Sequence, residues 1–200
     1  MSSLQVYKNY GKKNITINSK KNLSNLYAKS HYESEKIINR KFINNKNMFL
    51  IVRLGNVFGF KKPEDLSKIK NNLVHSLCFS AYKEKKILIK NGSIQRAFIP
   101  SHIFIHSLNT IIRKKYFKNS IINIVYKNLS LKNLAKIIKK RIKVIFQFNV
   151  EIMIEKNYHI KKYEIYRNKN FYFNPNNKII DAEIDQILKK IKKIKNYITL

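Results

Sequence analysis

Three pairs of side chains that could do chemistry stand about one helical turn apart: Tyr27 with His31, His75 with Cys78, and His102 with His106. Residues at this spacing lie on the same face of a helix, so the members of each pair could act together. The last two pairs are of metal-ligand types. No glutamate stands between His102 and His106, however, and the sequence suggests no third ligand for either pair. We interpret both as core or surface residues and expect no metal site.

Tyr27 and His31 combine a phenol with an imidazole, two groups that can exchange protons. Taken alone they fit an ordinary helix, just as Ser3 fits an ordinary strand. What sets them apart is their place in four blocks that follow one another along the chain. These blocks are SSLQVY at 2–7, YAKSHYESE at 27–35, RLGNVFG at 53–59 and NGSIQRAFI at 91–99.

In this order the blocks resemble the extended short-chain dehydrogenase/reductase family. The resemblance is to its NAD-dependent epimerase/dehydratase branch, which includes UDP-galactose 4-epimerase, and it covers about residues 2–113. It implies an α/β fold with an incomplete Rossmann-like parallel sheet, flanking helices and a small α/β substrate-binding region. We expect residues 1–60 to form the C-terminal part of the Rossmann-like domain, with the catalytic positions. Residues 61–200 then form the substrate-binding region, interleaved with the remaining sheet elements.

The resemblance also implies a role for each matching residue. Ser3 stands where the family has its catalytic serine or threonine. Tyr27 stands where a tyrosine takes a proton from a sugar hydroxyl while hydride passes to the nicotinamide of NAD or NADP. Asn56 matches an asparagine near the sugar-nucleotide substrate, and Arg96 matches an arginine that contacts the nucleotide diphosphate. His31 occupies the position of the lysine that holds the nicotinamide ribose and favours the phenolate.

That histidine is a departure from the family pattern. Neutral imidazole can hydrogen-bond a ribose but adds little positive charge at pH 7. Lys29 cannot substitute, because a residue two positions from Tyr27 points to another side of the helix. Ala97 and His102 also stand where relatives carry acidic residues. We therefore expect weaker catalysis and weaker substrate anchoring than the family pattern gives.

The chain also lacks the glycine spacing that grips a dinucleotide. The family binds the pyrophosphate at a Gly-rich strand-to-helix turn, whereas the four glycines here are scattered, at Gly11, Gly55, Gly59 and Gly92. We expect this chain alone not to bind NAD or NADP tightly. It is then a truncated product, or one subunit of a split enzyme that pairs with a separate dinucleotide-binding chain, or part of a homodimer.

Charge supports a rival interpretation. The sequence has 42 Lys and Arg against 11 Asp and Glu, a formal net charge of +31. Such a charge attracts nucleic acid or an anionic membrane. The lysines are spread along the chain, and Lys, Asn and Ile are abundant while Gly and Pro are scarce, which is typical of an AT-rich genome. Both compositional drift and a basic protein that binds nucleic acid on a retained fold stay open.

Other features favour a cytoplasmic protein. The single cysteine, Cys78, excludes a disulfide framework. The longest apolar runs, such as Met48–Val52 and Ile121–Tyr126, are too short to span a membrane, and the first residues do not have the pattern of a signal peptide.

The elements that must position these residues alternate between strand and helix, which favours an α/β fold. Residues 24–45 are predicted as a helix capped by Ser24, with Tyr27, His31, Ser34 and Ile38 along one stripe. The other predictions are a strand end at 2–7, strands at 49–54, 87–89 and 121–126, a loop at 56–62, and helices at 63–83, 101–115 and 182–198. Leu131, Leu134, Ala135, Ile138 and Ile142 recur at helical spacing. Residues 144–176 are expected to form short strands or irregular structure.

Overall fold

The computed structural model describes residues 1–8, 15–42, 48–59, 72–115, 120–156 and 174–198, with side chains up to residue 193. The chain forms two compact units. The first contains Met1–Val57, Gln95–Asn128 and Lys161–Asn174, and the second contains Phe58–Ile94, Leu129–Ile160 and Pro175–Leu200. The first division lies near the predicted boundary at 60/61. Residues 95–128, however, return to the N-terminal unit, because one of their strands pairs with a strand of that unit.

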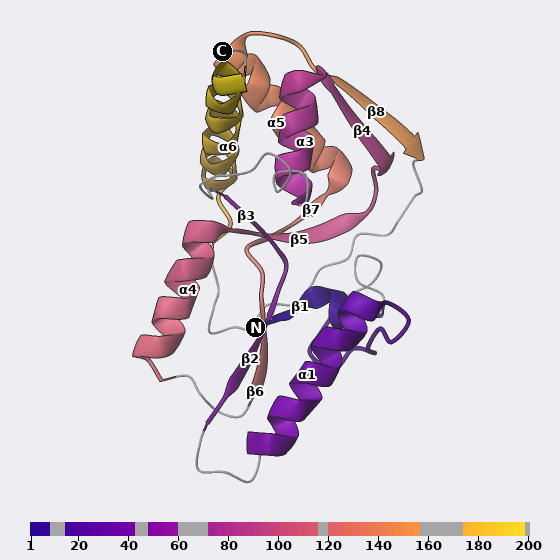
Figure 1. Cartoon of the computed structure of the whole chain (residues 1–200), viewed down its shortest axis with the longest axis vertical. Helices are drawn as coiled ribbons and strands as arrows, with labels where there is room; N and C mark the ends of the chain where they lie inside the picture. The colour runs from indigo at the N-terminus through magenta and orange to yellow at the C-terminus, as the bar shows by residue number, and fades with distance from the viewer. Residues whose placement is uncertain (9–14, 43–47, 60–71, 116–119, 157–173, 199–200) are drawn as a thin grey trace. The chain divides into compact units, whose positions relative to one another are not determined.

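The first unit is built on a parallel sheet in the order β1-β2-β6 (Figure 1). Strand β1 is Ser2–Ser3, β2 is Leu50–Leu54 and β6 is Ser120–Ile124. β2 pairs with β6 along its whole length, whereas β1 pairs only with Arg53 and Leu54. Leucine, isoleucine and valine dominate β2, as expected for a strand that is buried between neighbours.

Helices flank these strands. The 3-10 helix η1 (Leu4–Val6) follows β1, and helix α1 (Leu26–Phe42) packs against both. Strand β5 (Gln95–Pro100) leads directly into helix α4 (Ser101–Arg113). A further sheet has the order β3-β5-β7, with β3 at Asn56–Phe58 and β7 at Lys127–Ser130.

The second unit combines three helices with a two-stranded parallel sheet. Its helices are α3 (Leu73–Lys83), α5 (Leu131–Phe146) and α6 (Asn177–Ile198), which pack against one another. Its strands are β4 (Lys86–Asn91) and β8 (Glu151–Lys156). Ser130 caps α5 by accepting a hydrogen bond from the Asn133 amide at 3.1 Å. The helical spacing seen in the sequence places Leu134, Ala135, Ile138 and Ile142 on the buried face of α5.

The predicted α/β class, with parallel strands and flanking helices, is confirmed. Several local predictions were wrong. Asn56–Phe58 is a strand, not a loop, since β5 provides the partner that the local sequence does not show. Asn25, not Ser24, caps α1, because its side chain accepts a hydrogen bond from the Ala28 amide. Strand β7 was missed, and α5 continues to Phe146, into the stretch expected to be strands or irregular.

The residues that helix α1 buries stand outside the predicted stripe of Tyr27, His31, Ser34 and Ile38, a stripe for which the sequence carried no prediction of burial. Its buried residues are Ala28 and Glu35, while Tyr27 is 53% exposed. The cause is tertiary, because Glu35 is held in the interior by an arginine on β2. Two predictions fall partly outside the described residues. These are the helix at 63–83, of which residues 63–71 are not described, and the stretch at 144–176, of which residues 157–173 are not described. None of the helices in the described part of the chain combines the length and hydropathy that a membrane span needs.

Candidate active site

Tyr27 lies in the first turn of α1 with its ring exposed. The Asn25 side chain caps the helix by accepting from the Ala28 amide at 3.2 Å, which fixes where the first turn begins. His31 follows one turn later, and the ring centroids of Tyr27 and His31 are 4.6 Å apart in an edge-to-face arrangement at 73°. The structure therefore brings the predicted phenol and imidazole together on one accessible face of the helix.

Ser3 occupies the end of β1, the strand against which α1 packs. It is 9% exposed, and its hydroxyl accepts a hydrogen bond from the Gln5 amide at 3.2 Å, which caps η1. The neighbouring Ser2 hydroxyl is buried and has no hydrogen-bond partner among the described residues. Two serine hydroxyls thus lie at the carboxyl end of this strand, beside the helix that carries Tyr27.

A buried polar network holds α1 on the sheet. The Arg53 guanidinium donates to both carboxylate oxygens of Glu35, from Nε at 2.8 Å and from Nη2 at 2.6 Å. It also donates from Nη1 to the Tyr7 hydroxyl at 2.9 Å, which in turn donates to Asn123 Oδ1 at 2.7 Å. Arg53 is 1% exposed and Glu35 3% exposed. The network therefore joins α1, β2, β6 and the residue after η1 in the interior of the first unit.

Sequence reasoning missed this network, although three of its residues, Tyr7, Glu35 and Arg53, stand within the blocks. The available signal was an arginine inside an otherwise apolar strand. Arginine is almost never fully buried without a partner, so Arg53 in the middle of Leu50–Leu54 required an acid nearby. The sequence does not say which acid is the partner, because Glu35 stands 18 positions away from Arg53 along the chain.

Burial and the contacts within the network shift the pKa values of Tyr7 and Arg53. Burial raises the pKa of the Tyr7 phenol, although the Arg53 guanidinium acts in the opposite direction. Burial by itself lowers the pKa of Arg53, but its hydrogen bonds to Glu35 and its interactions with Tyr7 raise the pKa overall. Tyr7 is therefore a neutral hydrogen-bonding group at pH 7 and Arg53 stays charged. This tyrosine is a structural residue and no candidate for a proton acceptor.

Asn56 and Arg96 lie on the neighbouring strands β3 and β5. The Asn56 side-chain amide donates to the Ala97 carbonyl at 3.1 Å, so it reaches the residue next to Arg96. Gly55 makes this approach feasible, because a Cβ there would lie only 2.6 Å from the same carbonyl oxygen. The Arg96 side chain is partly buried and donates to the Gln95 carbonyl at 3.3 Å. The five predicted residues thus fall into two groups, one on β1 and α1 and one on β3 and β5.

The described residues do not fit a dinucleotide pyrophosphate. Such a site needs a Gly-rich turn between a strand and a helix, whose amides face the phosphates. The structure describes three direct strand-to-helix junctions: Ser3–Leu4, Pro100–Ser101 and Ser130–Leu131. None of them contains glycine, and Pro100 has no amide proton. Gly55 packs against Ala97, and Gly92 lies in the turn between β4 and β5.

His75 and the cysteine have structural surroundings. His75 Nε2 lies 2.9 Å from the Gly59 carbonyl oxygen. Cys78 is fully buried in α3, and burial raises the pKa of its thiol, so the thiolate that a nucleophile or metal ligand needs is disfavoured. Within the described ranges, no three histidine, cysteine or acidic side chains gather as a metal site would require.

Comparison with known proteins gives a clear result for the fold. No protein-family model matches the sequence, and no curated protein sequence matches it either. Solved structures do match. RMD from Pseudomonas aeruginosa, complexed with NADPH, aligns with a TM-score of 0.73 and 14% identity over 96% of this chain. UDP-glucuronic acid 4-epimerase from Bacillus cereus, in complex with UDP-glucuronic acid and NAD, aligns with a TM-score of 0.72 and 16% identity over 96% of this chain.

A third structure, dTDP-glucose 4,6-dehydratase from Bacillus anthracis in complex with NAD, aligns with a TM-score of 0.70 and 15% identity over 96% of this chain. The fold is that of the NAD-dependent epimerases and dehydratases. The chain spans 60–65% of the length of these three structures. At such low identity the match to this epimerase/dehydratase fold concerns the backbone, and the roles of individual side chains rest on their own geometry.

Proposed function

We propose that this chain carries the proton-transfer and substrate-binding residues of an NAD(P)-dependent sugar-nucleotide epimerase or dehydratase. The supporting observation is the exposed Tyr27–His31 pair on α1, a helix that packs against the strand ending in Ser3. This pair sits within an epimerase/dehydratase fold. The order of the four sequence blocks supports the same function independently of the fold.

In this proposal Tyr27 is the general acid–base. Its phenolic oxygen takes the proton of a sugar hydroxyl as that carbon is oxidised, and returns the proton when the carbonyl is reduced. Ser3 donates a hydrogen bond to the same sugar oxygen and so favours the charge that develops on it. His31 holds the Tyr27 ring by its edge and supplies a hydrogen-bonding nitrogen one turn away.

Asn56 and Arg96 bind the sugar nucleotide. Arg96 carries a fixed positive charge and a planar set of donors suited to a diphosphate. Asn56 is fixed by its bond to the Ala97 carbonyl, so its remaining amide groups have a defined direction. Because the described junctions do not fit a dinucleotide, we further propose that residues outside this sequence, in a separate dinucleotide-binding chain, bind NAD or NADP.

The test of this proposal adds a dinucleotide-binding portion from another protein. The NAD-binding portion of the Bacillus cereus epimerase, fused to or mixed with this chain, is assayed with a panel of UDP- and dTDP-sugars for sugar conversion. Tyr27→Phe should abolish conversion. Tyr32→Phe, the same change on the same helix, should leave it nearly unchanged. Activity that survives Tyr27→Phe would refute the role of Tyr27.

A binding measurement separates substrate recognition from catalysis. Titration of the unmodified chain with UDP-sugars should give saturable binding that Arg96→Ala weakens. Lys114→Ala, which removes a cation from the turn after α4, is the matched control. Equal effects of the two changes would mean that Arg96 contributes only general charge.

A further inference from the structure

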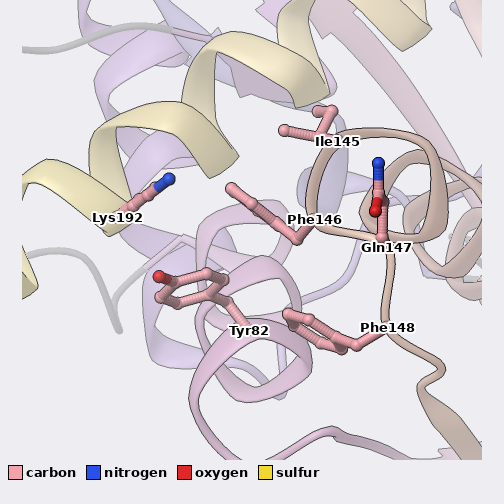
Figure 2. A pocket seen from close by; sticks show the side chains of 6 residues that line it. All are labelled: Tyr82, Ile145, Phe146, Gln147, Phe148 and Lys192. Carbon is pink, nitrogen blue, oxygen red and sulfur yellow. The ribbon is translucent and has the colours of Figure 1, made fainter.

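An aromatic pocket of about 330 Å³ opens on the second unit. Figure 2 shows its lining: Tyr82 from α3, Lys192 from α6, and Ile145, Phe146, Gln147 and Phe148 from the end of α5 and the chain after it. This volume is at the lower end of the range for small-molecule sites. None of the residues assigned to the proposed active site belongs to this unit.

Three rings form the wall of the pocket. Phe146 and Phe148 stack with centroids 6.0 Å apart and ring planes within 14°. Tyr82 lies against both, at 4.8 Å from Phe146 and 6.1 Å from Phe148. All three rings are partly exposed. Phe146 and Phe148 are thus nearly parallel, whereas Tyr82 is tilted by 57° to Phe146 and by 46° to Phe148. The two parallel, partly exposed faces are suited to a flat ring that extends their stack, with the tilted ring against its edge.

The backbone around the pocket is held in an unusual conformation. Gln147 ends α5 with a φ of 59°, and its amide donates to the Lys143 carbonyl at 3.1 Å. Lys85, just after α3, has a φ of 56°, and its carbonyl accepts from the Glu151 amide at 2.9 Å. Residues other than glycine seldom adopt this left-handed conformation. Gln147 lies between Phe146 and Phe148 and itself lines the pocket, and Lys85 bonds the chain at Glu151, three residues after Phe148.

Two lysines place positive charge on these rings. Lys192 Nζ lies 5.9 Å from the Phe146 ring centroid, and Lys85 Nζ lies 5.7 Å from that of Phe148. Both side chains are exposed, and none of the six lining residues is acidic. A cationic ligand, which aromatic cages otherwise favour, would be repelled here. The complementary ligand combines a flat ring with a negative charge.

We propose that this pocket binds one nucleotide of a single-stranded nucleic acid. Its base extends the stack of Phe146 and Phe148, with the tilted Tyr82 ring against its edge, while Lys192 and Lys85 contact the flanking phosphates. Stacking rings combined with a positively charged path for the backbone are the usual features of single-strand binding. The net charge of +31 adds long-range attraction for a polyanion.

The test measures binding of a fluorescein-labelled ten-nucleotide oligo(dT) and oligo(U) to the full 200-residue chain by anisotropy, from about 50 to 200 mM salt. Phe148→Leu removes an aromatic face and should weaken binding roughly five- to hundredfold, the usual effect of losing one base stack. Lys192→Gln should lower the slope of log K against log salt by about 0.7, as expected for one lost phosphate contact on a single strand. The matched controls are Phe42→Leu and Lys41→Gln, at the end of α1 in the first unit.

The proposal is supported if the two pocket variants lose affinity, the two controls do not, and duplex DNA binds more weakly than single strands. It is overturned if pocket and control variants behave alike, which would mean diffuse charge. It is also overturned if UMP displaces the labelled oligonucleotide at concentrations as low as an unlabelled oligonucleotide does, since the site then takes a free nucleotide and gains nothing from the strand. The proposal is overturned too if polyglutamate binds as tightly as the oligonucleotides and Phe148→Leu weakens that binding equally. Circular dichroism checks that each variant folds. Because Lys192 is exposed, the Lys192→Gln variant still tests the proposal if Phe148→Leu does not fold.

Discussion

Breaking the Arg53–Glu35 pair should destabilise the first unit severely, whereas replacing the whole pair should not. Arg53→Met removes four donated hydrogen bonds: two to Glu35, one to Tyr7 and a long one, at 3.5 Å, to the Ile17 carbonyl. It also leaves a carboxylate that is 3% exposed without its cation. Removing one member of a buried ion pair costs about 3–5 kcal/mol, because the other charge stays buried and unpaired. Glu35→Gln should cost a similar amount for the same reason.

The double variant Arg53→Met with Glu35→Leu removes both charges together. Replacement of a buried pair by apolar residues of similar size is typically neutral, or stabilising by about 1–4 kcal/mol. We expect some cost to remain here, because Tyr7 loses the donor at its hydroxyl while keeping its bond to Asn123. The double variant should nevertheless be more stable than either single variant.

The matched control is the exposed pair Lys36–Glu33 on the same helix. Its atoms are 3.0 Å apart and its side chains are 41% and 45% exposed. Exposed pairs contribute about 0–1 kcal/mol, so Lys36→Gln should change the free energy of unfolding by less than about 1 kcal/mol. The contrast between the two changes isolates burial, since both remove a cation that contacts a carboxylate of α1.

The assay must report on the first unit alone, because the chain contains two compact units. Hydrogen exchange of peptides covering Leu50–Leu54 gives the opening free energy of β2 directly. Urea unfolding followed by circular dichroism gives the global value. A cost of 1 kcal/mol or less for Arg53→Met would refute the assigned role of the pair. So would a double variant that costs as much as the two single changes together.

Three further outcomes are expected. In the reconstituted enzyme, His31→Lys adds a fixed positive charge one turn from Tyr27 and should raise the rate at pH 7 at least about tenfold, since acid–base groups contribute roughly 10²–10⁴-fold. No gain, with a harmless Tyr27→Phe, would contradict the proposed site. Calorimetric titration of the chain alone with NAD or NADP should show no low-micromolar binding. Such binding would contradict the conclusion that the described junctions do not fit a dinucleotide. Burial raises the pKa of the Cys78 thiol, so above about pH 8 the unfolded chain loses a proton that the folded chain keeps, and stability falls as pH rises. Cys78→Ala should flatten this fall in urea titrations between about pH 8 and 9.5, and an unchanged pH dependence would show that another group is responsible.

The sequence alone determined the features that depend on local patterns. The apolar run at Leu50–Leu54 predicted a buried strand, and the spacing from Leu131 to Ile142 predicted α5. Period and capping are properties of neighbouring residues, so they can be read without knowing the fold. The order of the four blocks likewise led to the α/β class that the structure and the comparisons confirm. It also named Tyr27 and His31, whose contact the helical spacing guarantees.

Tertiary structure alone decided which residues meet across the chain. Asn56–Phe58 reads as a loop because its strand partner, β5, is distant in sequence. The burial of Glu35 contradicts the polar character of the residue, and only Arg53 on another element explains it. The aromatic pocket likewise joins Tyr82 of α3 to Phe146 at the end of α5 and to Phe148 just after it. Such contacts depend on how elements pack, and packing is set by the whole chain rather than by any window of it.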